Sequence, residues 1–193
     1  LRPEETRAAS VFASLDAGVA SLRATAFANL YADPIRLRAH GASPFLRHEN
    51  GADYDAVGVE ARATVATRLF EGAASATLQR TRIGEGLYAG NSPAYESPLE
   101  GYAEAFVRPY RGVRVGPVAR YSGPYYPGDP NVYGTRRPGE WEWDAHASVE
   151  RAVGSAMMRV AVDARNLTDR KTRDFAFSPR SGRSGSLTLS VEI

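Results

Sequence analysis

The chain ends in Ser186-Leu187-Thr188-Leu189-Ser190-Val191-Glu192-Ile193, an unbroken alternation of polar and apolar residues. Side chains along a β-strand point alternately to opposite faces, so this stretch has one apolar face and one polar face. Such a strand at the end of a chain is typical of an outer-membrane barrel, whose outside contacts lipid while its inside holds water. The terminal stretch therefore predicts a membrane-spanning β-strand.

The same alternation recurs in earlier segments, which are separated in turn by short turns and by long loops. In the segment 54–69, for example, Glu60 and Arg62 alternate with the apolar Val59 and Ala61. We expect strands at about 8–15, 19–31, 54–69, 73–82, 101–110, 113–121, 140–153 and 156–167, before the terminal strand. The short turns are predicted at Asp16-Ala17-Gly18, Phe70-Glu71-Gly72, Arg111-Gly112 and Gly154-Ser155. The long connections are His40 to Asp53, Gly84 to Leu99, Ser122 to Gly139 and the stretch before the last strand.

This pattern predicts an all-β fold, an antiparallel up-and-down transmembrane β-barrel meander of about nine strands. Alanine is abundant and favours helices, but the strict alternation and the glycine turns argue for strands. A bacterial single-chain barrel has an even strand count. An odd count therefore favours part of a larger barrel, unless a further strand lies near 173–177.

Composition excludes several classes of function. The net charge of +2 on 193 residues gives no electrostatic case for nucleic-acid binding. The chain has no cysteine, so disulfides and thiolate metal sites are impossible. His40, His48 and His146 lack metal-ligand spacing, and no catalytic motif is present. We expect no enzyme activity, no metal and no cofactor.

Three ordered motifs carry a resemblance to a known family. Asn166-Leu167-Thr168-Asp169-Arg170-Lys171, followed by Pro179 and Gly182-Arg183, resembles the segment that precedes the last strand in TonB-dependent outer-membrane receptors. Leu1-Arg2-Pro3-Glu4-Glu5-Thr6 and Gly58-Val59-Glu60-Ala61 resemble two of that family's mid-barrel strands. The chain departs from the family at Thr168 and at Ile193, where an aromatic residue is usual.

The resemblance implies that residues 1–193 are the C-terminal segment of such a receptor barrel, without its plug domain and N-terminal strands. It implies residence in a Gram-negative outer membrane and energy-dependent uptake of a scarce nutrient such as an iron-siderophore. The implied partners are outer-membrane lipid, the plug domain, the remaining strands, an inner-membrane energy-coupling complex and an unidentified ligand.

Candidate site residues follow from the alternation and from the loops. Inward charges and loop tyrosines are candidates for substrate contact: Glu60, Arg62, Glu104, Arg108, Tyr125 and Tyr126. The inward charges could equally form a ladder that supports a plug. Trp141, Trp143 and Tyr121 lie where strands meet a long loop, and their amphipathic rings suit the membrane interface.

Two other functions stay open on the sequence. One is a complete small outer-membrane barrel with a structural or adhesion role, which requires an even strand count. The other is a soluble β-sandwich binding module, whose inner faces would need larger apolar residues than the alanine-rich faces found here.

Overall fold

The computed structural model describes residues 1–39, 46–86, 88–127, 136–170, 173–175, 178–179 and 182–192. These residues form β-strands joined by turns and loops. Among them there is no helix long and apolar enough to cross a membrane. The strands are β1 (Glu5–Ala17), β2 (Ala20–Ala32), β3 (Ile35–Ala39), β4 (Leu46–Asn50), β5 (Tyr54–Ala66), β6 (Phe70–Ile83), β7 (Leu99–Val107), β8 (Val113–Ser122), β9 (Glu140–Val153), β10 (Ala156–Arg165), β11 (Arg173–Phe175), β12 (Ser178–Pro179) and β13 (Ser184–Glu192).

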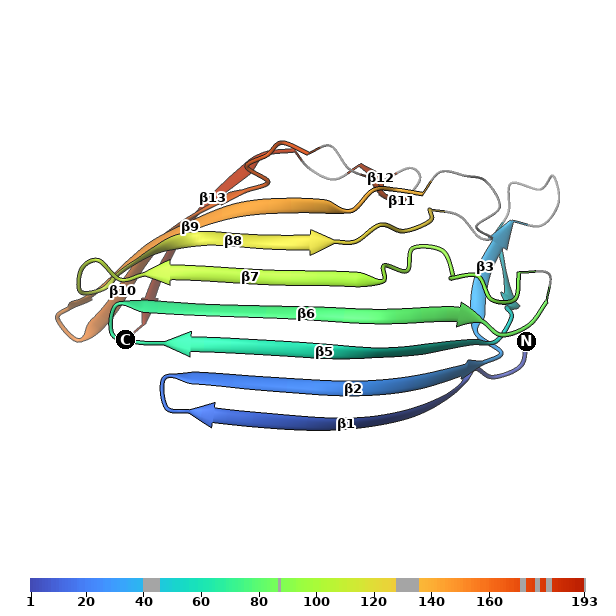
Figure 1. The fold of residues 1–193 in the computed structure, drawn as a ribbon. Helices are drawn as coiled ribbons and strands as arrows, with labels where there is room; N and C mark the ends of the chain where they lie inside the picture. The colour runs from blue at the N-terminus through green and yellow to red at the C-terminus, as the bar shows by residue number, and fades with distance from the viewer. Residues whose placement is uncertain are drawn as a thin grey trace.

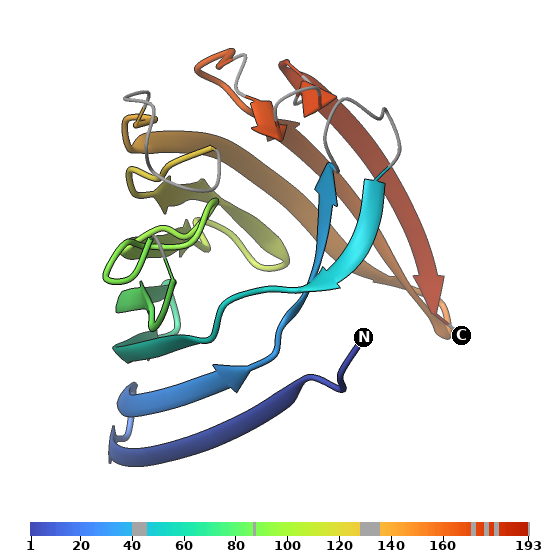
Figure 2. The ribbon, with the colours of Figure 1, turned by 90° about the vertical axis from the view of Figure 1, so that its right-hand side faces the viewer.

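Nine of the strands form one antiparallel sheet in the order β1-β2-β5-β6-β7-β8-β9-β10-β13. Figure 1 shows the short turns gathered at one end of the sheet and the long connections at the other. Seen along the strands in Figure 2, the sheet curves into an arc, and β1 and β13 are its two edges. The predicted meander of nine strands is confirmed.

The side chains on one face of the sheet, which belong to alternate residues of each strand, are apolar along almost its whole length. Across the strands it carries Ala26, Val59, Leu78 and Leu99, which are successive partners in the register. It continues with Val149, Val160 and Leu189 on β9, β10 and β13. Small and branched side chains, with alanine most frequent on β2, therefore form a continuous apolar surface on the convex side.

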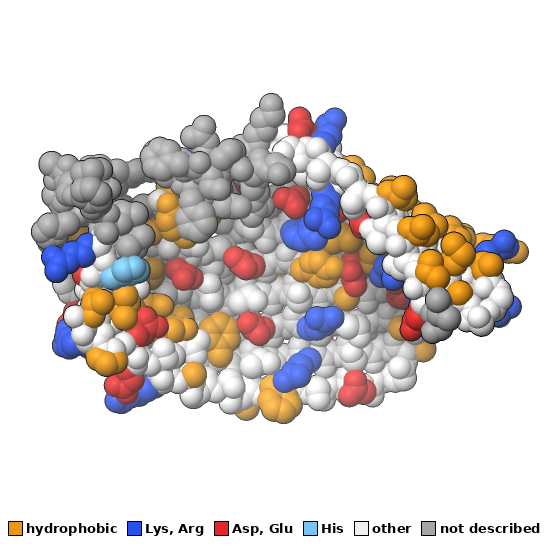
Figure 3. All heavy atoms as spheres, turned by 180° about the vertical axis from the view of Figure 1, so that it is seen from behind, with side chains coloured by type: hydrophobic (Ala, Val, Ile, Leu, Met, Phe, Trp, Pro, Cys, Tyr) orange, Lys and Arg blue, Asp and Glu red, His pale blue; other side chains and the backbone are white. Residues whose placement is uncertain are grey.

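The opposite parity is polar and lines the concave side. Seen from behind in Figure 3, the hollow of the sheet carries acidic and basic side chains, with some hydrophobic ones between them. The register aligns Thr25 with Glu60 and Glu60 with Thr77, so inward side chains face one another across neighbouring strands. Most described charged side chains on this face keep contact with solvent, while the buried Asp144 is paired with Arg120.

The structure corrects one predicted turn. Phe70-Glu71-Gly72 is the beginning of β6 and not a turn. The chain reverses at residues 67–70, where the amide of Thr67 donates to the carbonyl of Phe70 at 2.7 Å and the Phe70 amide donates to Thr67 Oγ1 at 3.0 Å. A threonine hydroxyl supplies the turn hydrogen bond that the glycine was expected to make possible.

Two short hairpins lie outside the nine-stranded sheet. Strands β3 and β4 pair with each other. β4 lies within the long connection predicted from His40 to Asp53, whereas β3 lies between that connection and the predicted strand 19–31. Figures 1 and 2 place this hairpin beyond the loop ends of the strands, leaning across the mouth of the arc. Strands β11 and β12 pair near residues 173–177, where a further strand was left open, but they do not join the main sheet.

Candidate functional site

The inward face of β6 to β10 holds a dense group of polar contacts. At the end with the short turns, Glu71 pairs with both Arg108 and Arg114. A cavity of about 470 Å³ opens beside them, and Ser148, Glu150 and Arg159 also line it. Three arginines and two glutamates therefore meet at this end of the concave face.

Phe106 lies on the concave face near the short-turn end of β7, directly opposite Glu71, and is only 2 % exposed. The guanidinium of Arg114 lies 3.4 Å from the centre of its ring. The ring of His146 meets it edge-on, with centroids 5.8 Å apart. An aromatic ring between a guanidinium and an imidazole gives this part of a polar wall a packed apolar centre.

His146 is held by one acidic neighbour. Its Nδ1 lies 2.8 Å from Oδ1 of Asp163 on β10, the directly opposed residue in the register. Its Nε2 is buried and finds no hydrogen-bond partner among the described residues. The Asp163 contact thus fixes the ring and leaves one imidazole nitrogen to face the packed interior.

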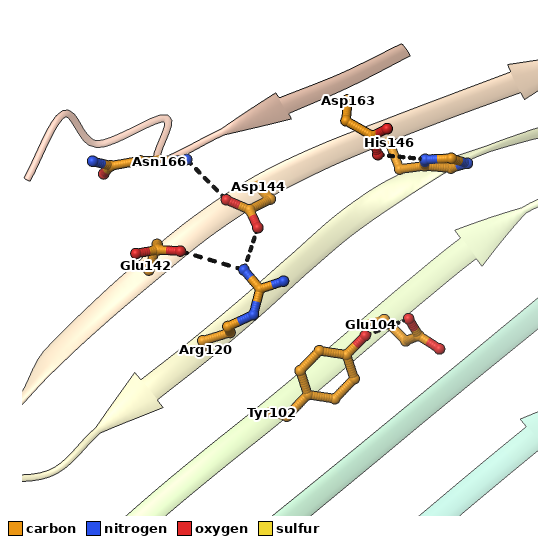
Figure 4. A network of polar contacts seen from close by, with 8 residues as sticks. All are labelled: Tyr102, Glu104, Arg120, Glu142, Asp144, His146, Asp163 and Asn166. Carbon is orange, nitrogen blue, oxygen red and sulfur yellow. Dashed lines mark hydrogen bonds and ion pairs between the residues drawn. The ribbon is translucent and has the colours of Figure 1, made fainter. Parts of the chain in front are cut away.

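Closer to the long loops, Asp144 joins the concave wall to a connection (Figure 4). One of its oxygens accepts from the Arg120 guanidinium, and the other accepts from the amide of Asn166 at 2.8 Å. Asp144 is 6 % exposed, so its charge is compensated where water has little access. On β7, which pairs with the other side of β8, the Tyr102 hydroxyl donates to Glu104 at 2.5 Å.

The Asn166-to-Arg170 segment owes its residue types to the turn that it makes. Asn166 and Asp169 both have φ of 52°, a left-handed conformation that asparagine and aspartate tolerate better than most residues. The Asn166 side chain accepts from the Arg170 amide and donates to the Arg170 carbonyl, both at 2.9 Å. Asp169 accepts from the Arg183 amide at 3.2 Å, which ties the turn to the start of the last strand. The motif therefore closes a connection and needs no ligand to explain it.

The structure separates the four predicted inward charges into two pairs. Glu104 on β7 and Arg108, which directly follows β7, belong to the contacts described above. Glu60 and Arg62 lie on β5, are exposed on the concave face, and form no ion pair with any described residue. Whether any of the four contacts a substrate remains a prediction.

The predicted aromatic residues fall into two groups. The rings of Trp141, Trp143 and Tyr121 form a row on the convex face near the loop end, with centroids 4.9 Å and 6.0 Å apart. Trp141 and Trp143 are more than two-fifths exposed, which an interfacial belt requires. Tyr125 and Tyr126 lie in the loop after β8. Tyr125 pairs through its backbone with Arg137, and Tyr126 accepts from the Tyr95 amide.

Several members of the inward contact group were absent from the predicted site. Glu71 was assigned to a turn, and Arg114 and Arg120 were not singled out. Both arginines could have been predicted to point inward, because they alternate with the outward Val113 and Val115 along the same strand. The burial of Phe106 had no signal in its own strand, since its neighbours on the same face are charged.

Among the described residues, no group of three acidic, histidine or cysteine side chains could hold a metal ion. His40 lies outside those residues.

No family model matches the sequence, and no curated protein matches it. Solved structures do match its fold. The ferric-catecholate import receptor Fiu from Escherichia coli K12 aligns over 98 % of this chain and 27 % of its own, with 18 % identity and a TM-score of 0.70. The ferric preacinetobactin receptor BauA from Acinetobacter baumannii aligns over 99 % and 30 %, with 14 % identity and a TM-score of 0.76. The copper transporter OprC aligns over 97 % and 31 %, with 18 % identity and a TM-score of 0.72.

These matches confirm the predicted fold, a strand meander that corresponds to part of a larger receptor barrel. The chain spans less than a third of each of those structures. Each of the three is named as a receptor or a transporter and not as an enzyme.

Proposed function

We propose that this chain forms part of the barrel wall of an outer-membrane receptor that imports a scarce nutrient. The observation that carries the proposal is the division of the sheet into two faces. One curved antiparallel sheet has an apolar convex side and a polar concave side across all nine strands. That division is required of a wall with lipid on one side and water on the other.

The nutrient proposed is a metal chelate of the iron-siderophore kind. Two of the matched structures are named for ferric chelates, and a third is named for copper. In this proposal the substrate passes the concave face, a plug domain closes the lumen, and an inner-membrane complex supplies the energy. Trp141, Trp143 and Tyr121 mark the lipid–water interface at the extracellular end.

The order of the sheet favours this proposal over a complete small barrel. In the described residues β1 and β13 are the two edges and do not pair with each other. An open edge in lipid would leave backbone hydrogen-bonding groups without partners, so further strands must complete the wall. A soluble sandwich is disfavoured because no second sheet of the described chain covers the apolar convex face.

Uptake by the intact protein tests the proposal. Cells that carry the gene should take up radiolabelled iron from a panel of chelates under iron limitation, and an uncoupler of the inner membrane should abolish that uptake. A folded band that shifts on heating, found in the outer-membrane fraction, should accompany it. Uptake that survives the uncoupler would indicate a passive pore and contradict the proposed energy-dependent import.

A further inference from the structure

A row of hydrogen-bond donors crosses the concave face. The register aligns Ser14 with Arg23, Arg23 with Arg62, and Arg62 with Ser75. It continues from Ser75 to Tyr102 and from Tyr102 to Arg120. We call these six residues the arginine row. They come from six strands, so only the pairing of the sheet brings them together.

The neighbouring row, one step closer to the long loops, has the opposite charge. It aligns Thr25, Glu60, Thr77, Glu100, Ser122 and Glu140 in the same way. Hydroxyls separate its three glutamates, whereas the arginine row sets two arginines side by side. Charge is therefore spread out in one row and concentrated at one point of the other.

That point is the pair formed by Arg23 and Arg62. Directly opposed residues on antiparallel strands have Cβ atoms roughly 5 Å apart, and like charges there repel. Both side chains are exposed on the concave face, and neither forms an ion pair with a described residue. Arg120, by contrast, already pairs with Asp144 and Glu142.

The pair is also partly arranged for a ligand. The Arg23 guanidinium lies 4.8 Å from the centre of the Phe12 ring, which restricts its position. Ser14 and Ser75 flank the two arginines and can donate from either side. Two planar guanidinium groups with flanking hydroxyls match the oxygens of a carboxylate or a phosphate.

We propose that Arg23 and Arg62, with Ser14 and Ser75, form a seat for an oxyanion on the concave wall. The inference rests on the proposed function, because it requires this face to line a lumen. The oxyanion belongs either to an anionic group of the transported chelate or to a carboxylate of the polypeptide that fills the lumen. In both cases two guanidinium groups bind one anionic group and remove the repulsion between them.

The test compares thermal unfolding of the intact protein with that of three variants, with tryptophan fluorescence as the readout. Arg23→Gln/Arg62→Gln removes both charges, Arg23→Lys/Arg62→Lys keeps the charges but loses the planar fork, and Arg80→Gln on the convex face is the matched control. Each is titrated with inorganic phosphate, with sodium chloride at equal ionic strength as the reference. A heat-shifted gel band in the outer-membrane fraction is first required of the wild type.

For a diffusible anion, phosphate should raise the unfolding midpoint of the wild type and of Arg80→Gln above the chloride reference. The apparent affinity should fall at least about tenfold in the glutamine double variant and by less in the lysine one. For a carboxylate of the protein itself, phosphate should have no effect on the wild type. The glutamine double variant should then unfold at a lower temperature than Arg80→Gln.

The seat is overturned if the glutamine double variant responds to phosphate as the wild type does and does not unfold at a lower temperature. Absence of the heat-shifted band in the wild type is a different failure. It contradicts the barrel itself, and it is seen before any anion is added.

Discussion

The two halves of the concave face differ in how tightly their side chains pack, although the same alternation of polar and apolar residues forms both. In each half an inward phenylalanine lies beneath an arginine: Phe12 beneath Arg23 on β1 and β2, and Phe106 beneath Arg114 on β7 and β8. Phe12 is 62 % exposed, whereas Phe106 is 2 % exposed. The same pair of residue types is thus a surface contact in one half and a packing centre in the other.

The neighbours explain the difference. Phe106 lies opposite Glu71 on β6, and Gly116 on β8 lies between it and His146 in the register. Because Gly116 has no side chain, the His146 ring reaches Phe106 across the strand that separates them. Phe12 lies on an edge strand and has Thr25 as its partner on one side only. A strand pattern therefore specifies which face a side chain occupies, while the degree of packing depends on residues one and two strands away.

Replacing Phe106 or Phe12 by alanine should give the largest difference in stability between the two halves. Phe106→Ala should lower the free energy of unfolding by about 3–5 kcal/mol, the usual cost of emptying a buried aromatic site. Phe12→Ala should cost about 0.5 kcal/mol, as for a surface substitution. Denaturant unfolding of the intact protein in lipid vesicles measures both. Equal costs would show that the strands completing the wall bury Phe12 as deeply as Phe106.

The convex face should show no such difference between the halves. Val59→Arg and Val160→Arg each place a charge on an outward, exposed apolar position, and each should cost about 2–4 kcal/mol if that position faces the lipid core. Thr188→Arg on the inward parity of β13 is the control and should cost little. The same unfolding measurement applies. A small cost at either valine would place that position outside the membrane.

Removing one carboxylate from each half should also lower stability by different amounts, but the difference should be smaller than for the two phenylalanines. Asp144→Ala deprives Arg120 and the Asn166 amide of an acceptor, and hydrogen bonds to charged groups contribute about 1.5–3 kcal/mol. Glu60→Ala should change stability by about 0.5 kcal/mol or less, because Glu60 is exposed and has no ion-pair partner among the described residues. Chemical denaturation of both variants tests this. A larger loss for Glu60→Ala would reveal a partner for that carboxylate in the lumen.

The smallest expected effect comes from one hydroxyl. Tyr102→Phe removes the hydrogen bond to Glu104, which should cost about 0.5–1.5 kcal/mol because both groups keep some contact with water. Thr77→Val, at the neighbouring inward position of β6, is the control for loss of a hydroxyl that has no side-chain hydrogen bond among the described residues. Unfolding midpoints in denaturant distinguish the two variants. Equal midpoints would mean that the Tyr102 contact adds nothing to stability.

Much of the fold followed from alternation and turn residues alone. The segment 140–153 and the Gly154-Ser155 turn match β9 and its turn as predicted, because tryptophan and glutamate alternate and a glycine with φ of 62° ends the strand. The turn at Phe70 was wrong because a threonine hydroxyl, and not the glycine, closes the reversal. The β3–β4 hairpin was not predicted, although Ile35–Ala39 alternates between apolar residues and arginine, because its partner Leu46–Asn50 shows no such alternation.

The nine strands of the main sheet and their two faces could be predicted from the local pattern of residues. The physical reason is local: neighbouring side chains of a strand must point to opposite sides, whatever the strand pairs with. Which charges pair could be seen only in the folded sheet. The pair of Arg23 with Arg62, the contact of Asp144 with Arg120, and the ring of His146 against Phe106 all join residues from different strands. The register of neighbouring strands decides which of these residues come into contact, and that register depends on how all the strands of the sheet pair.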